Sequence, residues 1–226
     1  MDPSFWLARW QAGEIGFHQA EINPHLQLYW PALHAAPGSC VFVPLCGKSR
    51  DMLWLAGQGH AVMGVEISPI AVADFFEENA LTFTTQADAR FVRRRAGEIV
   101  LLEGDFFDLS RDLSRDLNRA DLDGIAAVYD RASLIALPPS LRGRYAEHMA
   151  ALLSPGTPVL LITLDYPPQE MDGPPFAVSA AEVETLFAST FHIETLGGQD
   201  ILAENPRFQA RGLTRLQEQV YRLVRC

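Results

Sequence analysis

The sequence predicts an α/β fold built on one mostly parallel sheet, and three observations support this prediction. Short apolar stretches alternate with amphipathic ones along the 226 residues, as in sheets flanked by helices. Residues 40–68 read as strand, turn, helix and strand, with an acid directly after the second strand. Residues 191–196 and 217–224 are strand-like and predict a closing antiparallel hairpin. Because no break in composition separates these parts, we expect a single domain over residues 1–226.

Two short helices are expected before the first strand. Each begins at a capping residue followed by proline, at Asp2 and at Asn23. They end at Gly13 and at Pro31, because glycine and proline interrupt a helix. Both helices precede the first strand, so they do not connect strands of the sheet and must pack on the outside of the domain.

Trp6 and Trp10 lie four residues apart in the first of these helices, so they share one face. Paired aromatics most often anchor a helix to the core. Alternatively, the helix lies over the strand tips and one indole walls a ligand pocket. In that case Phe17 and His18, in the loop that follows, lie at the rim of the pocket. For His18 a structural role is the more common one.

The segment 40–68 carries the strongest functional signal. Its first strand, Cys40–Val43, leads into a tight turn at Gly47, and its second strand, Ala61–Val65, ends at Glu66. Parallel strands of such a unit end side by side, so a ligand across their tips meets the turn and the acid together. Glu66 follows Gly47 by about 20 residues, a spacing at which an acid accepts hydrogen bonds from a ribose diol. The pattern favours a nucleoside-containing cofactor over the plainer alternative that Glu66 faces solvent.

The turn itself distinguishes between nucleoside cofactors. It contains no G-x-G-x-x-G, and Pro44 and Leu45 occupy the positions where a pyrophosphate needs close approach of the backbone. S-adenosylmethionine contains adenosine but no phosphate, so an acid and a tight turn suffice. We therefore expect S-adenosylmethionine rather than NAD. Cys46 lies in this turn without a histidine or acid close to it in sequence, so it is not expected to act as a nucleophile.

A helix at 69–79 and two short strands within 91–102 continue the chain. Asp105 follows them, so its carboxylate could accept the adenine amino group while Phe106 packs on the ring. An ordinary strand-end turn explains both residues equally well. Residues 109–121 then form a polar insertion with a tandem LSRD, which we expect to be a solvated loop or helical turn.

The next strand, 124–129, ends in Asp130 and Arg131. Unpaired charges at the end of a buried strand are costly, so two interpretations of Arg131 remain open. It either contacts an anion, the cofactor carboxylate or a substrate group, or pairs with Asp130 or another acid. A long polar loop before the last strand adds Arg207 and Arg211.

A helix at 138–153 and a strand at 157–164 precede the loop 166–178, which holds four prolines. Such stiffness suits a rim of fixed shape better than a flexible linker. Ser179 and Glu182 form a capping box at the start of the following helix.

Composition excludes several classes of function. A formal net charge of −10 argues against nucleic-acid binding, and the one basic run, Arg93–Arg95, is expected on a solvated strand or hairpin face. No apolar run approaches the roughly 20 residues that span a bilayer, and the N-terminus does not resemble a signal peptide. We therefore expect a cytoplasmic protein. Three cysteines without metal-ligand spacing, Cys40, Cys46 and Cys226, predict reduced thiols and no metal site.

Several runs in the chain resemble one known family. VFVPLCGKS, GHAVMGVEIS, FFDL, YDRASL and GPPFAV follow Trp6, Trp10 and Phe17–His18 in this order, as in the bacterial branch of the thiopurine S-methyltransferase family. The likeness covers nearly the whole chain. PLCGK, GVEIS and GPPF are far more specific than a generic nucleotide-binding pattern.

The resemblance implies a Rossmann-like class I methyltransferase: a seven-stranded, mostly parallel sheet with helices on both faces and a C-terminal antiparallel hairpin strand. It implies methyl transfer from S-adenosylmethionine to the sulfur of thiopurines and other aromatic thiols, and in bacteria to selenium or tellurium compounds. We further expect residues 1–35 to form a helical cover over the cofactor site. The expected partner is a small-molecule acceptor, with no nucleic acid or membrane, and the expected state is a monomer.

Carried over residue by residue, the resemblance implies cofactor contacts at Trp10, Leu45, Glu66, Asp105, Phe106 and Arg131. It implies acceptor contacts at Phe17, Arg131 and Arg207. The two arginines could favour an ionised thiol electrostatically, so no general base is assigned. The insertion at 109–121 departs from the family pattern by roughly two helical turns.

Two other functions remain open at this point. One is a nicotinamide-dependent oxidoreductase on a similar sheet, against which the missing glycine fingerprint argues. The other is a cofactor-binding protein without catalysis.

Overall fold

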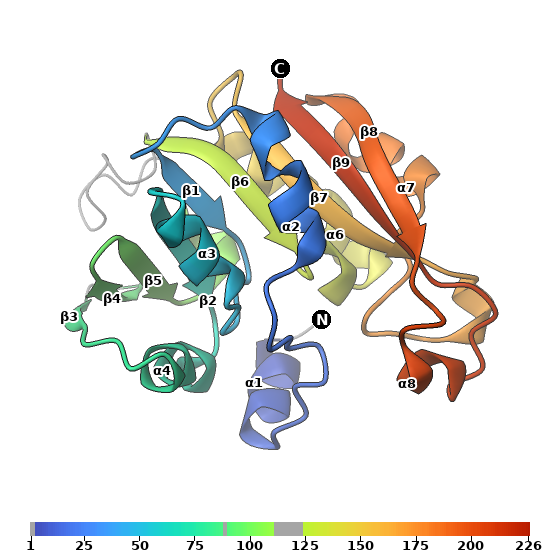
Figure 1. Ribbon diagram of the computed structural model, residues 1–226, viewed down its shortest axis with the longest axis horizontal. Helices are drawn as coiled ribbons and strands as arrows, with labels where there is room; N and C mark the ends of the chain where they lie inside the picture. Colours follow the sequence, from blue (N-terminus) through green and yellow to red (C-terminus); the bar gives the residue numbers. More distant parts are fainter. Residues whose placement is uncertain (1–2, 88–89, 111–123) are drawn as a thin grey trace.

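The computed structural model describes residues 3–87, 90–110 and 124–226, and these form one nine-stranded sheet (Figure 1). The strand order is β3-β4-β5-β2-β1-β6-β7-β9-β8. The strands are β1 (Cys40–Val43), β2 (Ala61–Glu66), β3 (Thr84–Ala87), β4 (Val92–Ala96), β5 (Ile99–Glu103), β6 (Ile125–Arg131), β7 (Pro158–Asp165), β8 (Phe191–Asp200) and β9 (Gln217–Arg225).

Five central strands, β5-β2-β1-β6-β7, run parallel. The chain builds outward from β1 in one direction through β2 and β5, then returns to the other side of β1 with β6 and β7. The strand order therefore reverses between β1 and β6. In an open α/β sheet this switch point leaves a crevice at the carboxyl ends of the strands, where ligands bind.

The sheet has two strands more than the seven that the resemblance implied. The two strands expected within residues 91–102 are confirmed as β4 and β5, and β3 and β4 extend the sheet beyond β5. They pair antiparallel with each other, and β4 pairs antiparallel with β5. The basic run Arg93–Arg95 lies on β4, which confirms the hairpin face expected for it. β3 has no counterpart in the prediction, because its four residues are all exposed and show no apolar alternation. The closing hairpin of β8 and β9 is confirmed.

Helices cover both faces of the sheet, as expected. They are α1 (Pro3–Gln11), α2 (Pro24–Tyr29), α3 (Asp51–Gly57), α4 (Pro69–Glu78), α6 (Pro139–Leu152), α7 (Ala180–Phe187) and α8 (Pro206–Gln209), with 3₁₀ turns η1 (Trp30–Leu33), η2 (Phe106–Asp108), η3 (Leu134–Ala136) and η4 (Pro168–Glu170). One core cluster joins the sheet to α2, α3 and α4, and a second joins it to α6 and α7. In Figure 1, α2 and α3 lie on the near face and α6 lies on the far face.

Local chemistry explains where three helices begin. The side chain of Asn23 accepts hydrogen bonds from two backbone amides of α2, and Ser68 caps α4 in the same way. Ser179 accepts from the Glu182 amide, so the first half of the expected capping box forms. The second half does not, because the Glu182 carboxylate accepts a hydrogen bond from Arg142 at 2.5 Å instead.

The proline-rich loop 166–178 is held by buried side chains rather than by its prolines alone. The Tyr166 hydroxyl donates to the carbonyl of Pro175 at 2.6 Å. The guanidinium of Arg142, 1% exposed, donates to the carbonyls of Leu137 and Ala177. These bonds explain how a loop without regular structure keeps one shape.

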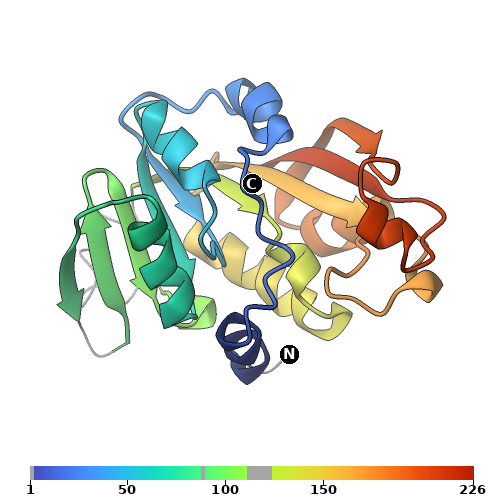
Figure 2. The same ribbon diagram turned by 60° about the horizontal axis from the view of Figure 1, so that its bottom comes forward.

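α1 lies beyond the carboxyl ends of the central strands and covers neither face of the sheet. Figure 1 shows it below the strand tips, and Figure 2 brings it toward the viewer. The loop from α1 to α2 then crosses these tips. Residues 111–121 of the expected insertion lie outside the described residues. Within the described part of the chain, no helix is both long and apolar enough to cross a membrane.

Candidate functional site

A cavity of about 340 Å³ lies at the carboxyl ends of β1, β2, β6 and β7. Its walls come from the turn after β1, the ends of β2 and β7, the segment after β6, the α1 region, and the segment between β8 and β9. This is the crevice that the switch point of the sheet leaves open, and the volume suits a small-molecule ligand. The cavity therefore gathers segments from both ends of the chain.

Glu66 forms one end of this cavity. It is 6% exposed, and its two carboxylate oxygens accept the amides of Gly47 at 2.9 Å and Ser68 at 2.8 Å. Burial raises the pKa of Glu66 above its ordinary value, while these two amides act in the opposite direction. The acid that the sequence singled out is thus held in place by the turn and helix on either side of it.

The turn after β1 has an unusual backbone where it meets the cavity. Leu45 and Gly47 both adopt positive φ, 42° and 52°. A Cβ atom at Gly47 would lie 3.3 Å from the ring of Trp10, so glycine serves both the backbone and the close approach. Leu45 has no such freedom, and its left-handed conformation is a strain of the kind found at ligand sites.

The aromatic residues of the N-terminal segment were expected either to anchor the first helix to the core or to form a wall of the ligand pocket, and the structure shows both. Trp6 and Trp10 line the cavity together with Phe17. Trp10 is also 5% exposed, and its ring packs edge-on against Phe17 with centroids 5.5 Å apart. The tryptophans therefore anchor α1 and form part of the cavity wall.

Next to this wall lies a buried cation, Lys48, whose ammonium is 6.0 Å from the Trp10 ring. Lys48 pairs with Asp74 at 2.9 Å and with Glu78 at 2.6 Å, both on α4. His18 also lines the cavity, where burial and the Lys48 charge lower its pKa. Both effects favour the neutral form of the imidazole.

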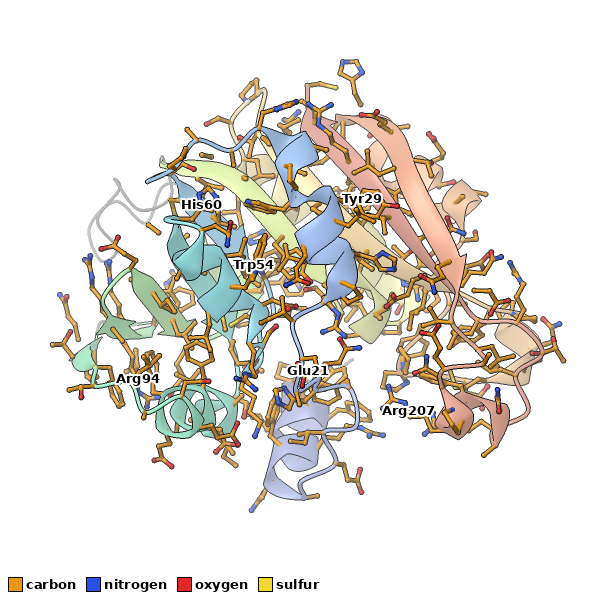
Figure 3. All side chains as sticks on the ribbon, viewed as in Figure 1. Glu21, Tyr29, Trp54, His60, Arg94 and Arg207 are labelled. Atoms are coloured by element: carbon orange, nitrogen blue, oxygen red, sulfur yellow. The ribbon has the colours of Figure 1, made fainter. Side chains whose placement is uncertain are left out.

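Three arginines form the other end of the cavity: Arg131, the last residue of β6, Arg207 on α8, and Arg211 beyond α8. Figure 3 shows Arg207 directed from α8 toward the N-terminal segment, where it donates a hydrogen bond to the Gly16 carbonyl. Burial lowers the pKa of Arg207, and the charges of Arg211 and Arg131 add to this effect. The guanidinium groups are therefore close enough to repel one another.

Arg131 does not pair with Asp130. The Asp130 carboxylate is buried and accepts the hydroxyl of Tyr145 at 2.6 Å, and the described residues include no ion pair for Arg131. Arg131 thus lines the cavity without an ion-pair partner among the described residues.

Two residues expected at the cofactor do not line the cavity, although both lie in the described part of the chain. Asp105 caps η2 through the Phe107 amide. Phe106 is 1% exposed, and its ring packs between Phe42 and Tyr145 in the core. For Phe106 the plainer alternative, a residue of a strand-end turn, fits the structure better. Apolar residues at strand ends point inward as readily as toward a ligand.

Two polar residues of the cavity wall were not expected from the sequence. The Tyr129 hydroxyl donates to Asp51 at 2.9 Å, and the same carboxylate accepts the Asn23 amide at 2.8 Å. Glu218 pairs with His25 at 3.0 Å. Asp51, the partner of Tyr129, looks like an ordinary first-turn acid. Tyr129 lies in an apolar strand and Glu218 in an alternating one, so no local pattern marks either as a cavity residue. Together they fasten α2 to the sheet beside the cavity.

Cys46 lines the cavity as well. Burial raises the pKa of its thiol well above the ordinary value, and the nearby Glu66 charge adds to the effect. A thiol that stays protonated is a poor nucleophile, so the structure argues against covalent catalysis here.

Comparison with known proteins places this architecture among methyltransferases. The thiopurine S-methyltransferase family matches residues 1–226. A thiopurine S-methyltransferase of Nitrosospira multiformis is 53% identical over 99% of this chain and 98% of its own, and one of Azotobacter vinelandii is 49% identical over the full length of both. The solved structure of 1,6-didemethyltoxoflavin-N1-methyltransferase from Burkholderia thailandensis, with S-adenosylhomocysteine bound, shares the fold. Its TM-score is 0.61 at 18% identity, over 97% of this chain and 86% of that one.

Proposed function

The chain belongs to the thiopurine S-methyltransferase family, and we propose that it methylates the sulfur of thiopurines and other aromatic or heterocyclic thiols. It is an enzyme that uses S-adenosylmethionine and acts on a small-molecule acceptor. The nature of the acceptor and the roles of individual residues are the proposed part.

One observation carries the proposal. A single cavity at the switch point of the sheet has a backbone-held carboxylate, Glu66, at one end and three arginines at the other. S-adenosylmethionine has a ribose diol that needs an acceptor and a carboxylate that needs a cation. Glu66 fits the first group and Arg131 fits the second, with Trp10 and Leu45 as apolar wall. The residues present therefore suit this cofactor.

When bound, the cofactor supplies a methyl group on a positively charged sulfur. The chain contributes by holding the acceptor sulfur in line with that methyl group, since orientation alone can contribute several kcal/mol. Arg131 and Arg207 favour the ionised form of an acceptor thiol by lowering its pKa. Phe17 packs against the acceptor ring. This assignment needs no general base, and the neutral His18 is left without a catalytic role.

The N-terminal segment, residues 1–35, serves in this proposal as a helical cover over the cofactor. Trp6, Trp10 and Phe17 support it because they line the cavity from outside the sheet. Cofactor contacts for Asp105 and Phe106, a cytoplasmic location, a monomeric state and action on selenium or tellurium compounds stay predictions from the sequence.

Thermal unfolding with two ligands tests the cofactor class first. S-adenosylhomocysteine at about 100 times its dissociation constant adds roughly 2.7 kcal/mol, which raises the midpoint by several degrees in a domain of this size. NAD at the same concentration should leave the midpoint unchanged. A shift with NAD alone would favour an oxidoreductase. A shift with S-adenosylhomocysteine but no turnover of 6-mercaptopurine or thiophenol would favour a binding protein without catalysis.

A further inference from the structure

Lys48 is the only lysine among the 18 lysine and arginine residues of the chain, and it is 6% exposed. Its ammonium lies 2.9 Å from the Asp74 carboxylate and 2.6 Å from the Glu78 carboxylate, which are one turn apart on α4. A compact ammonium can donate to two separate carboxylates, whereas a planar guanidinium suits two bonds to a single one. A lysine therefore fits a position where several groups are joined at one point.

The side chain of Lys48 joins the two elements that hold Glu66. One amide donor to Glu66 belongs to Gly47, the residue before Lys48 in the turn after β1. The other belongs to Ser68, the N-cap of α4. Burial by itself would lower the pKa of Lys48, but the hydrogen bonds to its two carboxylate partners outweigh burial and raise it. The ammonium is therefore charged, and two ion pairs tie the turn to α4.

Lys48 also contacts the N-terminal segment. Its ammonium lies 6.0 Å from the centroid of the Trp10 ring, within reach of a cation–π attraction. The same ring lies against Gly47, where a Cβ atom would be 3.3 Å from it. Lys48 and Trp10 both line the cavity, whereas neither of the two carboxylate partners does, although both lie in the described part of the chain. One side chain thus connects the turn, α4 and the cover helix α1.

From these contacts we propose that Lys48 is a positioning residue for cofactor binding. It holds the two Glu66 donors and the Trp10 ring in the arrangement that S-adenosylmethionine needs, and it does not touch the reacting sulfur or methyl group. The inference rests on the proposed place of the cofactor between Glu66 and Arg131. A preformed site lowers the ordering cost of binding. Substitution of Lys48 should therefore change cofactor affinity and leave the methyl-transfer step nearly unchanged.

Calorimetric titration of the purified chain with S-adenosylhomocysteine tests the inference. Lys48→Met keeps an apolar side chain of similar length without the charge, and we expect its dissociation constant to rise about tenfold. Lys48→Arg should recover only part of the affinity, because a guanidinium does not make both short contacts. With saturating S-adenosylmethionine and 6-mercaptopurine, kcat of Lys48→Met should stay within about threefold of the parent, while KM for the cofactor rises about tenfold. A fall in kcat with an unchanged KM for the cofactor would overturn the inference.

Asp74→Asn combined with Glu78→Gln separates positioning from direct contact with the ligand. This double variant leaves Lys48 in place and changes a half-buried and an exposed side chain on α4, so we expect it to fold. If Lys48 acts by positioning, affinity for S-adenosylhomocysteine should fall by roughly three- to tenfold. If the ammonium binds the ligand itself, its release should leave affinity unchanged or raise it, and the inference is then wrong. Glu77→Gln, an exposed acid on the same helix, is the control and should bind like the parent.

A comparison with Glu66→Ala keeps this inference separate from the proposed function. If Glu66→Ala weakens binding but Lys48→Met binds as tightly as the parent, only the role of Lys48 is overturned. If both variants bind like the parent, the cofactor lies away from the Glu66 end and both proposals are wrong. Should Lys48→Met not fold, the double variant on α4 gives the same test with Lys48 in place.

Discussion

The two ends of the cavity are built in opposite ways. At one end Glu66 is nearly inaccessible, and both of its oxygens already accept backbone amides from the turn and helix beside it. At the other end Arg131, Arg207 and Arg211 come from separate segments and have no carboxylate partner among the described residues. The first end is rigid because the backbone defines it. The second has unused hydrogen-bond donors, so its geometry depends on the ligand.

The difference suits the two substrates of a methyltransferase. The cofactor is always the same molecule, so its site can be rigid. A rigid site loses little conformational entropy when the cofactor binds. Acceptors of a thiol methyltransferase vary, and long cationic side chains adjust to different anions. Substitutions at the Glu66 end should therefore affect cofactor affinity, and substitutions at the arginine end should affect turnover of the acceptor.

The largest expected effect is that of Arg131→Ala on turnover. Losing the charge contact between the half-buried Arg131 and its ligand should cost about 2.7 kcal/mol, which corresponds to roughly 100-fold in kcat/KM with a thiopurine. Arg131 has no ion pair with any residue that the structure describes, so the unfolding midpoint should move by only about 2 °C. Steady-state kinetics and thermal unfolding on the same preparation check both values. Parent-level turnover would remove Arg131 from the site.

Glu66→Ala should affect cofactor affinity rather than turnover of the acceptor. A ribose diol would lose its acceptor, so affinity for S-adenosylhomocysteine should fall at least tenfold, on the order of 1.4 kcal/mol. Titration calorimetry measures this directly. Glu77→Ala, an exposed acid on α4, is the control and should bind like the parent. If Glu66→Ala binds as tightly as that control, the rigid end is not the cofactor end.

A third prediction concerns Asp130, a carboxyl that faces the core behind Arg131. Burial raises its pKa from 3.8 to about 6, and one of its oxygens has no hydrogen-bond partner. Below pH 3.8 the group is protonated in both states, and between these values the folded protein keeps a proton that the unfolded chain releases. The stability this provides is therefore lost as pH rises through about 6.

Asp130→Asn should remove this dependence, because an amide does not ionise and still accepts the Tyr145 hydroxyl. Relative to the parent, the variant should gain about 1 kcal/mol of stability between pH 5 and pH 7. Urea unfolding of both proteins at the two pH values provides the comparison. The same difference in stability at both would show that Asp130 does not titrate in this range.

The Glu66 end of the cavity could be predicted from the sequence because the residues that form it lie close together in the chain. β1, α3 and β2 follow one another within residues 40–66, and apolar strands with glycine stops define their bounds. Glu66 follows from the spacing to Gly47 alone. Its two amide donors are neighbours of that turn and of the Ser68 cap, so the contacts were implied once the unit was recognised.

The arginine end could not be assembled in the same way. Arg131 was placed by the strand before it, but Arg211 meets it only through the long-range pairing of β7 with β9. Tyr129 and Glu218 show no local pattern that separates a cavity residue from a core or surface one. Phe106 shows the reverse case, because it was expected at the cofactor but packs in the core. An aromatic residue after a strand can face the ligand or the core, and only the packing decides.

β3 and β8 form the two open edges of the sheet. β3 is fully exposed at one edge, next to the arginine-rich β4, and β8 shifts register between Thr195 and Gly197 at the other. Exposed edges invite strands of other molecules to add to the sheet, and charge or a bulge discourages such addition. Both features are of the kind that discourages edge-to-edge addition of strands.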